Sequence, residues 1–173
     1  RRYAATRMPV RPCLIPTSPC IDNAHSLKDD WPSCVWQKGA WLAEEAEPVA
    51  GELGAQALEE LDAFLKAGSS PVAIGWGSLL PPNLGPAGLL VLGLLAVMQA
   101  GCRAVVVGGW ARLHELGVEL QNMSIQLDTE RYPWMRHRVR EASDFARQRE
   151  RCFFVASAPH QWLFKRCCCV VHH

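Results

Sequence analysis

The feature that most constrains the fold is a long stretch without charge: between Lys66 and Arg103 there is no charged side chain. It begins with a short apolar segment at 72–74, turns through glycines, and continues as a longer apolar segment at 85–100. A second short apolar segment follows at 103–107. We expect strand, helix and strand here, which is a βαβ unit. Such units pair their strands in parallel through right-handed crossovers, so the stretch predicts an α/β fold with a parallel sheet.

The apolar segment could also be taken for a membrane span. Its core at 87–100 ends at Gly101, and Pro81, Pro82 and Pro86 crowd its start. A bilayer-spanning helix needs about 20 apolar residues, and this core is shorter. We therefore expect a helix that is buried in the protein.

Further elements extend the same pattern. Apolar and charged residues alternate at helical spacing over 55–67, and Gly68 follows as a helix stop. Two more apolar segments, at 152–157 and 167–171, are expected to be buried strands. Between them, 162–164 is expected to form a single helical turn.

We expect residues 1–54 to be an irregular connector and 55–173 to be the N-terminal part of one domain. Within the domain, the arginine-rich segment at about 112–151 reads as a surface insertion, either a solvated helix or a flexible loop. It could also serve as a nucleic-acid arm, but it offers no aromatic platform beyond Tyr132 and Trp134.

Charge and cysteine spacing limit the partners. The formal net charge is +1, which does not favour a nucleic-acid partner. The eight cysteines include no C-x-x-C pair, so we expect no zinc site and no other metal site. They also do not form a secretory disulfide framework, so we expect reduced thiols.

Small and polar residues follow every expected strand of the domain, at 75–78, 108–110, 156–160 and 172–173. The carboxyl ends of parallel strands lie at one edge of a sheet, where ligands bind in open α/β folds. Glycine lets the backbone approach a ligand, and serine and histidine offer hydrogen bonds. Together these ends predict a site for a phosphate-bearing ligand. The dinucleotide pattern G-x-G-x-x-G is absent.

Three segments carry a family resemblance. I-G-W-G-S-L at 74–79 resembles the I-G-F-G-S-M loop of family 1 glycosyltransferases of the sterol glucosyltransferase type. D-W-P at 30–32, with Trp41 further on, resembles the family's D-W-P…G-x-W stretch. Residues 153–173, F-F-V-A-S-A-P-H-Q-W-L-F-K-R-C-C-C-V-V-H-H, are similar to F-F-V-G-S-V-P-H-D-W-L-F-P-R-C-A-A-V-V-H-H-G-G-A-G-T. The family continues with G-G-A-G-T, so we expect a chain truncated within the donor-binding domain.

The resemblance implies a GT-B fold, in which two Rossmann-like domains face a cleft. This chain would be the connector and the first half of the C-terminal domain, a partial Rossmann-like parallel sheet. The implied activity is transfer of a hexose, glucose by expectation, from a UDP-sugar to a sterol or other lipophilic alcohol with inversion. The UDP-sugar is the donor substrate, and no cofactor or metal is implied. The resemblance further suggests a cytoplasmic protein that can associate peripherally with membranes.

The resemblance also implies a donor-nucleotide site. Gly77 and Ser78 would face the diphosphate and sugar, and Ala158, with Ser157 beside it, would bind uracil through its backbone. The remaining implied residues are His160 near the ribose, His173 at the phosphates, its neighbour His172, and Trp110 near the donor cleft.

The chain departs from the family pattern at Gln161, where Asp is usual, and at Lys165, where Pro is usual. The family's catalytic base lies in the N-terminal domain, so no residue here is assigned that role and the chain alone is expected to be inactive. Two alternatives stay open: a truncated, inactive paralogue that acts as an interaction module, and a nucleotide-binding protein of unrelated function.

Overall fold

The computed structural model describes residues 13–15, 35–37, 54–77 and 84–172. The chain divides into two units, Arg1–Glu44 and Glu45–His173. In the first unit, strands β1 (Cys13–Ile15) and β2 (Val35–Gln37) pair in parallel, an element that the pattern of residues 1–40 does not predict. The predicted boundary at residue 54 stays a prediction.

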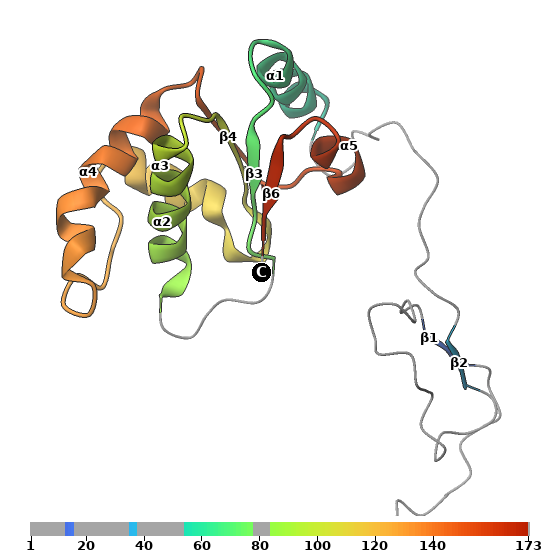
Figure 1. Cartoon of the computed structure of the whole chain (residues 1–173), viewed down its shortest axis with the longest axis horizontal. Coiled ribbons are helices and arrows are strands. Elements are labelled where there is room, and N and C mark those ends of the chain that lie inside the picture. The colour runs from blue at the N-terminus through green and yellow to red at the C-terminus, as the bar shows by residue number, and fades with distance from the viewer. Residues whose placement is uncertain (1–12, 16–34, 38–53, 78–83, 173) are drawn as a thin grey trace, which may run out of the picture. The chain divides into compact units, whose positions relative to one another are not determined.

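The second unit alternates strands and helices (Figure 1). Its elements are α1 (Ala55–Lys66), β3 (Val72–Ile74), α2 (Gly85–Gln99), β4 (Ala104–Val107), the 3-10 turn η1 (Gly109–Ala111), α3 (Leu113–Gln121), α4 (Pro133–Arg147), β5 (Cys152–Val155), α5 (His160–Phe164) and β6 (Cys169–Val171). The strands and the short helical turn expected near the C-terminus are present, within a few residues of their expected bounds. The expectation that the last strand is buried is wrong: Cys169 is exposed and Val170 and Val171 are half-buried, because β6 is an edge strand of the sheet.

The four strands β3 to β6 form one parallel sheet in the order β5-β4-β3-β6. Counted along the chain from β3, the spatial order is third, second, first, fourth. This is the strand order of one half of a Rossmann-like sheet. The first three strands are added in one direction across the sheet and the fourth is added on the other side of β3, so the strand order reverses between β3 and β6. The prediction of an α/β protein with a partial Rossmann-like parallel sheet is confirmed.

Helices cover both faces of this sheet: α2, α3 and α4 lie on one side, and α1 and α5 lie on the other (Figure 1). The side chains of β3 alternate accordingly. Val72 and Ile74 pack in the cluster on the α2 side, and Ala73 packs in the cluster on the α1 side. Because both faces are covered, the strands consist almost entirely of apolar residues.

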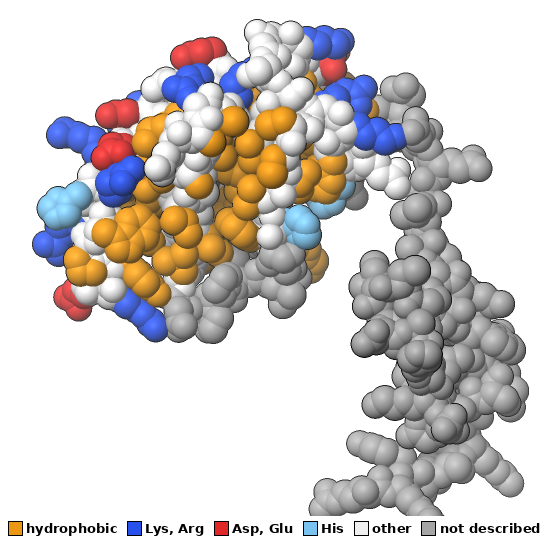
Figure 2. Space-filling view, in the orientation of Figure 1, with side chains coloured by type: hydrophobic (Ala, Val, Ile, Leu, Met, Phe, Trp, Pro, Cys, Tyr) orange, Lys and Arg blue, Asp and Glu red, His pale blue; other side chains and the backbone are white. Residues whose placement is uncertain are grey.

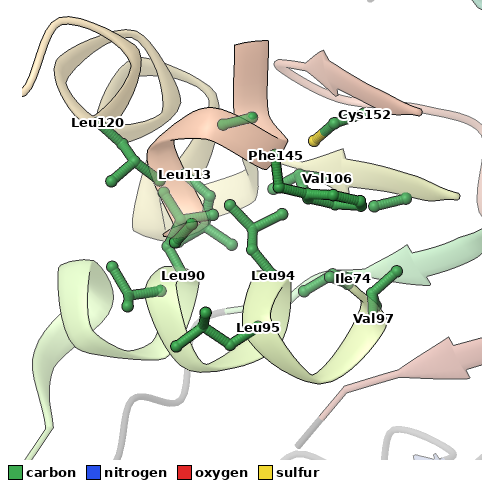
Figure 3. Packing of buried hydrophobic residues seen from close by; sticks show 14 of the residues in the cluster. Ile74, Leu90, Leu94, Leu95, Val97, Val106, Leu113, Leu120, Phe145 and Cys152 are labelled. Carbon is green, nitrogen blue, oxygen red and sulfur yellow. The ribbon is translucent and has the colours of Figure 1, made fainter. Parts of the chain in front are cut away.

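Helix α2 is a core element of the domain. Leu90, Val91 and Leu94 have no exposed surface, and Figure 3 shows Leu94 beside Phe145 of α4. Its opposite side is less covered: Leu92 is 44 % exposed, and Figure 2 shows apolar side chains gathered on the face where Figure 1 draws α2. Among the described residues, no helix combines the length and apolarity needed to cross a bilayer.

The arginine-rich segment is not a flexible loop. It forms α3 and α4, which together connect β4 to β5. Met135, Ala142, Phe145 and Ala146 of α4 are at most 1 % exposed and pack against the sheet and α2. The arginines lie on the outer side of a helix whose inner side is part of the core. The segment is therefore the crossover connection of the sheet.

Arg103 lies at the amino-terminal edge of the sheet and is only 8 % exposed. Its guanidinium donates hydrogen bonds to the backbone carbonyls of Phe64, Ser69 and Glu150, at 2.6, 2.9 and 2.9 Å. It also lies 3.9 Å from the centroid of the Phe64 ring. Burial lowers the pKa of this arginine from its ordinary value. One side chain thus ties together the end of α1, the approach to β3 and the approach to β5.

Candidate functional site

A cleft of about 420 Å³ opens at the carboxyl ends of the four strands. All four strands contribute to it, through their last residues or through the loops that follow them. The lining residues are Ala73, Ile74, Gly75, Gly77, Val107, Gly109, Trp110, Ser157, Ala158, His160, Phe164, Val170 and His172. The cleft includes the ends of β3 and β6, where the strand order reverses, and open α/β sheets bind ligands at such a point.

The cleft brings together six of the eight residues predicted from the sequence. They come from four separate loops: Gly77 after β3, Trp110 after β4, Ser157, Ala158 and His160 after β5, and His172 after β6. The other two predicted residues, Ser78 and His173, lie outside the described residues.

The loops leave the sheet from well-fixed positions, because the hydrogen-bond ladder continues past the strand ends. The amide of Gly75 donates to Val171 at 3.0 Å, and the amide of Gly109 donates to Ala156 at 2.9 Å. These backbone donors are therefore already used within the protein. Hydrogen bonds to a ligand must come mainly from side chains and from the turn at Gly77, whose φ of 54° suits glycine.

Gly108 allows the β4 loop to pack closely. A Cβ atom at this position would overlap the imidazole of His114 and lie 2.9 Å from the backbone oxygen of Ala156. The oxygen belongs to the neighbouring loop and cannot rotate away. This close approach places the β4 and β5 loops side by side at the cleft.

Trp110 lies at the rim of the cleft with 87 % of its surface exposed. It belongs to the short turn η1, which ends at Arg112 in a left-handed conformation with φ of 53°. A tryptophan this exposed offers a flat apolar face to a ring-shaped ligand. The geometry therefore agrees with a role at the cleft, since burial in the core does not account for the position of this side chain.

The cleft contains no aspartate, glutamate, lysine or arginine among its lining residues, and its titratable side chains are His160 and His172. An anionic ligand would therefore meet no carboxylate there, and either imidazole can donate a hydrogen bond to a phosphate oxygen. In the described part of the chain, no three His, Cys, Asp or Glu side chains lie close enough together to hold a metal ion.

Sequence reasoning missed one aromatic wall of the cleft. Phe164 lines it from the end of α5, and its ring stacks on that of His160 with centroids 4.9 Å apart and planes 9° apart. The helical turn expected at 162–164 was too short to include His160. The observed helix begins at His160, four residues before Phe164, and this spacing places the two side chains on one face.

The chain has detectable relatives among known proteins, although no protein-family profile matches it. It is 29 % identical to a sterol 3-beta-glucosyltransferase of Leptosphaeria maculans over 144 residues, which cover 83 % of this chain. It is 38 % identical to the dTDP-epi-vancosaminyltransferase of Amycolatopsis orientalis over 77 residues, or 44 % of this chain. It is also 29 % identical to the sterol 3-beta-glucosyltransferase UGT80A2 of Arabidopsis thaliana over 132 residues, or 76 % of this chain.

The chain is homologous to family 1 glycosyltransferases. This agrees with the parallel sheet, which is that of a partial Rossmann-like domain of the GT-B type. The homology is confined to a small part of the relatives: the chain spans 8 %, 17 % and 14 % of the lengths of the three proteins named above.

Proposed function

We propose that this chain is part of the donor-binding domain of a glycosyltransferase. The full reaction would transfer a hexose, with glucose as the first choice, from a UDP-sugar to a sterol or other lipophilic alcohol with inversion. Several homologues are named sterol 3-beta-glucosyltransferases, which supports the sugar and the acceptor. The single observation that carries the proposal is the convergence of four strand ends on one cleft at the reversal of strand order.

In this proposal the diphosphate lies over the ends of β3 and β6. Gly77 and Ser78 would approach it from one side, and His172 and His173 from the other. The exposed turn at Gly77 supports this, since it brings backbone without a side chain to the cleft. The absence of carboxylates from the lining also supports it, because two phosphates carry charge that a carboxylate would repel.

The nucleoside would occupy the side of the cleft formed by the β4 and β5 loops. Ser157 and Ala158 would contact the uracil, Ala158 through its backbone, and His160 would lie near the ribose. Trp110 would cover the site from its rim, since its exposed ring can lie against a flat surface.

The chemistry assigned to this chain is stabilisation of the leaving group. When an acceptor hydroxyl attacks the anomeric carbon and the sugar–phosphate bond breaks, negative charge grows on the departing UDP. Histidine donors at the strand ends would stabilise that charge, more strongly when protonated. We assign no residue of this chain as the base that deprotonates the acceptor. We propose a cytoplasmic enzyme that meets its lipophilic acceptor at a membrane surface.

Isothermal titration calorimetry of the chain with UDP, UDP-glucose and dTDP tests this proposal. Binding of UDP and UDP-glucose is the expected result, and His172→Ala should weaken it about 10- to 100-fold by removing one hydrogen bond to a charged group. His137→Ala is the matched control, because His137 is exposed on α4 and does not line the cleft. Stronger binding of dTDP would favour a thymidine donor, as the name of one relative suggests. No binding of any nucleotide, or equal effects of the two variants, would contradict the proposal.

A further inference from the structure

Two aromatic side chains on α5 stack against each other at the cleft. His160 and Phe164 are the first and last residues of this five-residue helix, and both line the cleft. Their ring centroids are 4.9 Å apart and their planes are within 9° of parallel. The two rings therefore form one parallel-stacked pair at the wall of the cleft, and each ring restricts the orientation of the other.

The helix itself is anchored from its other side. Leu163 has no exposed surface and packs in the cluster beneath α1, and its amide donates to Pro159 at 2.9 Å. The cleft-facing side is different. His160 is exposed, and its imidazole makes no hydrogen bond or ion pair with the described residues. Its ring stacks on that of Phe164, which is itself 37 % exposed.

An exposed imidazole without such a neighbour would rotate among several rotamers. A ligand that binds one of these rotamers would have to fix the side chain in it. Fixing a side chain on binding lowers affinity by an amount set by the rotamer freedom that is lost. The core does not require a phenylalanine at 164, because its ring is partly open to solvent. Its contact with His160 and its place in the cleft are what distinguish it from an ordinary surface residue.

We propose that Phe164 is a positioning residue of the donor site, which holds the imidazole of His160 in the orientation that binds the nucleotide. This rests on the proposed function. Phe164 acts through His160: the ordered ring is present before the nucleotide arrives, so binding does not have to order it.

The test compares Phe164→Leu, which removes the ring and keeps an apolar side chain, with Phe164→Tyr, which keeps the ring. UDP affinity is measured by calorimetry for each variant in the wild-type background and in a His160→Ala background. Phe164→Leu should weaken UDP binding about 2- to 10-fold, and Phe164→Tyr should stay within about twofold of the wild type. In the His160→Ala background, Phe164→Leu should have no further effect.

A second readout needs no nucleotide. The ring current of Phe164 shifts the NMR signals of the His160 imidazole, and Phe164→Leu should remove that shift while Phe164→Tyr keeps it. The proposal is overturned if Phe164→Leu binds UDP like the wild type, or if it weakens binding equally without His160. Failure of the wild type to bind UDP would instead refute the proposed function, together with the positioning role that depends on it.

Discussion

Replacing Arg103 with methionine should lower the free energy of unfolding by about 2–4 kcal/mol. The guanidinium donates hydrogen bonds to three backbone carbonyls, but losing these three bonds does not cost the same free energy at each carbonyl. Ser69 and Glu150 are exposed residues whose carbonyls can regain water, whereas the bond to Phe64 is buried. Leaving that carbonyl unpaired costs about 1–3 kcal/mol. Loss of the cation–π contact with the Phe64 ring adds roughly 1 kcal/mol.

The assay is urea unfolding followed by far-ultraviolet circular dichroism, with the slope against urea checked for constancy. Arg166→Met is the matched control. Arg166 also lies over an aromatic ring, that of Trp162 at 4.5 Å, and donates to a backbone carbonyl at 2.9 Å, but it is exposed. Its loss should cost about 0.5 kcal/mol or less. If Arg103→Met costs no more than Arg166→Met, the buried arginine does not hold the three segments together.

Three further predictions concern packing, pH dependence and thiol reactivity. Gly117→Ala should destabilise the fold by about 1–3 kcal/mol because the new methyl group would overlap the ring of Phe154, whereas Gly93→Ala, with only ordinary contacts, should be neutral or slightly stabilising in the same unfolding assay. Burial raises the pKa of the Cys152 thiol from 9.0 to about 12. Between these two values the unfolded chain loses the thiol proton and the folded chain keeps it, so the free energy of unfolding is unaffected by this group below pH 9 and falls as the pH rises toward 12. The loss should approach about 1.4 kcal/mol per pH unit, and Cys152→Ala should remove that component; equal pH dependence of the two proteins would refute the assignment. At pH 8 the exposed Cys168 should react with a thiol reagent well before the buried Cys152 does, as measured by mass spectrometry. The reverse order would show that Cys152 is not buried in the core.

The sheet and its site could be predicted because the apolar segments are short, uncharged and followed by small or polar residues. Segments 72–74 and 152–155 contain no residue that suits a surface, so burial on both faces was the direct interpretation. Convergence of the residues after them then follows from parallel pairing alone. The roles given to Ser78 and His173 stay predictions.

Helix α4 was harder to predict because its charges conceal its apolar side. Met135, Ala142 and Ala146 recur at helical spacing, but four arginines lie within residues 133–147 and dominate the composition. Arg103 was missed for a different reason. A sequence shows that a charge precedes a strand, but it does not show that three carbonyls from distant segments meet at that point.

NMR titration of the isotopically labelled chain with UDP can show whether the ends of the four parallel strands form one nucleotide site. If they do, the amide signals of Gly77, Ser157 and His172 and the indole signal of Trp110 will shift together with a single dissociation constant. Signals from Ser124, which lies beyond α3 and does not line the cleft, should stay unchanged. Shifts confined to a single loop, or no shifts at millimolar UDP, would show that the strand ends do not form one nucleotide site.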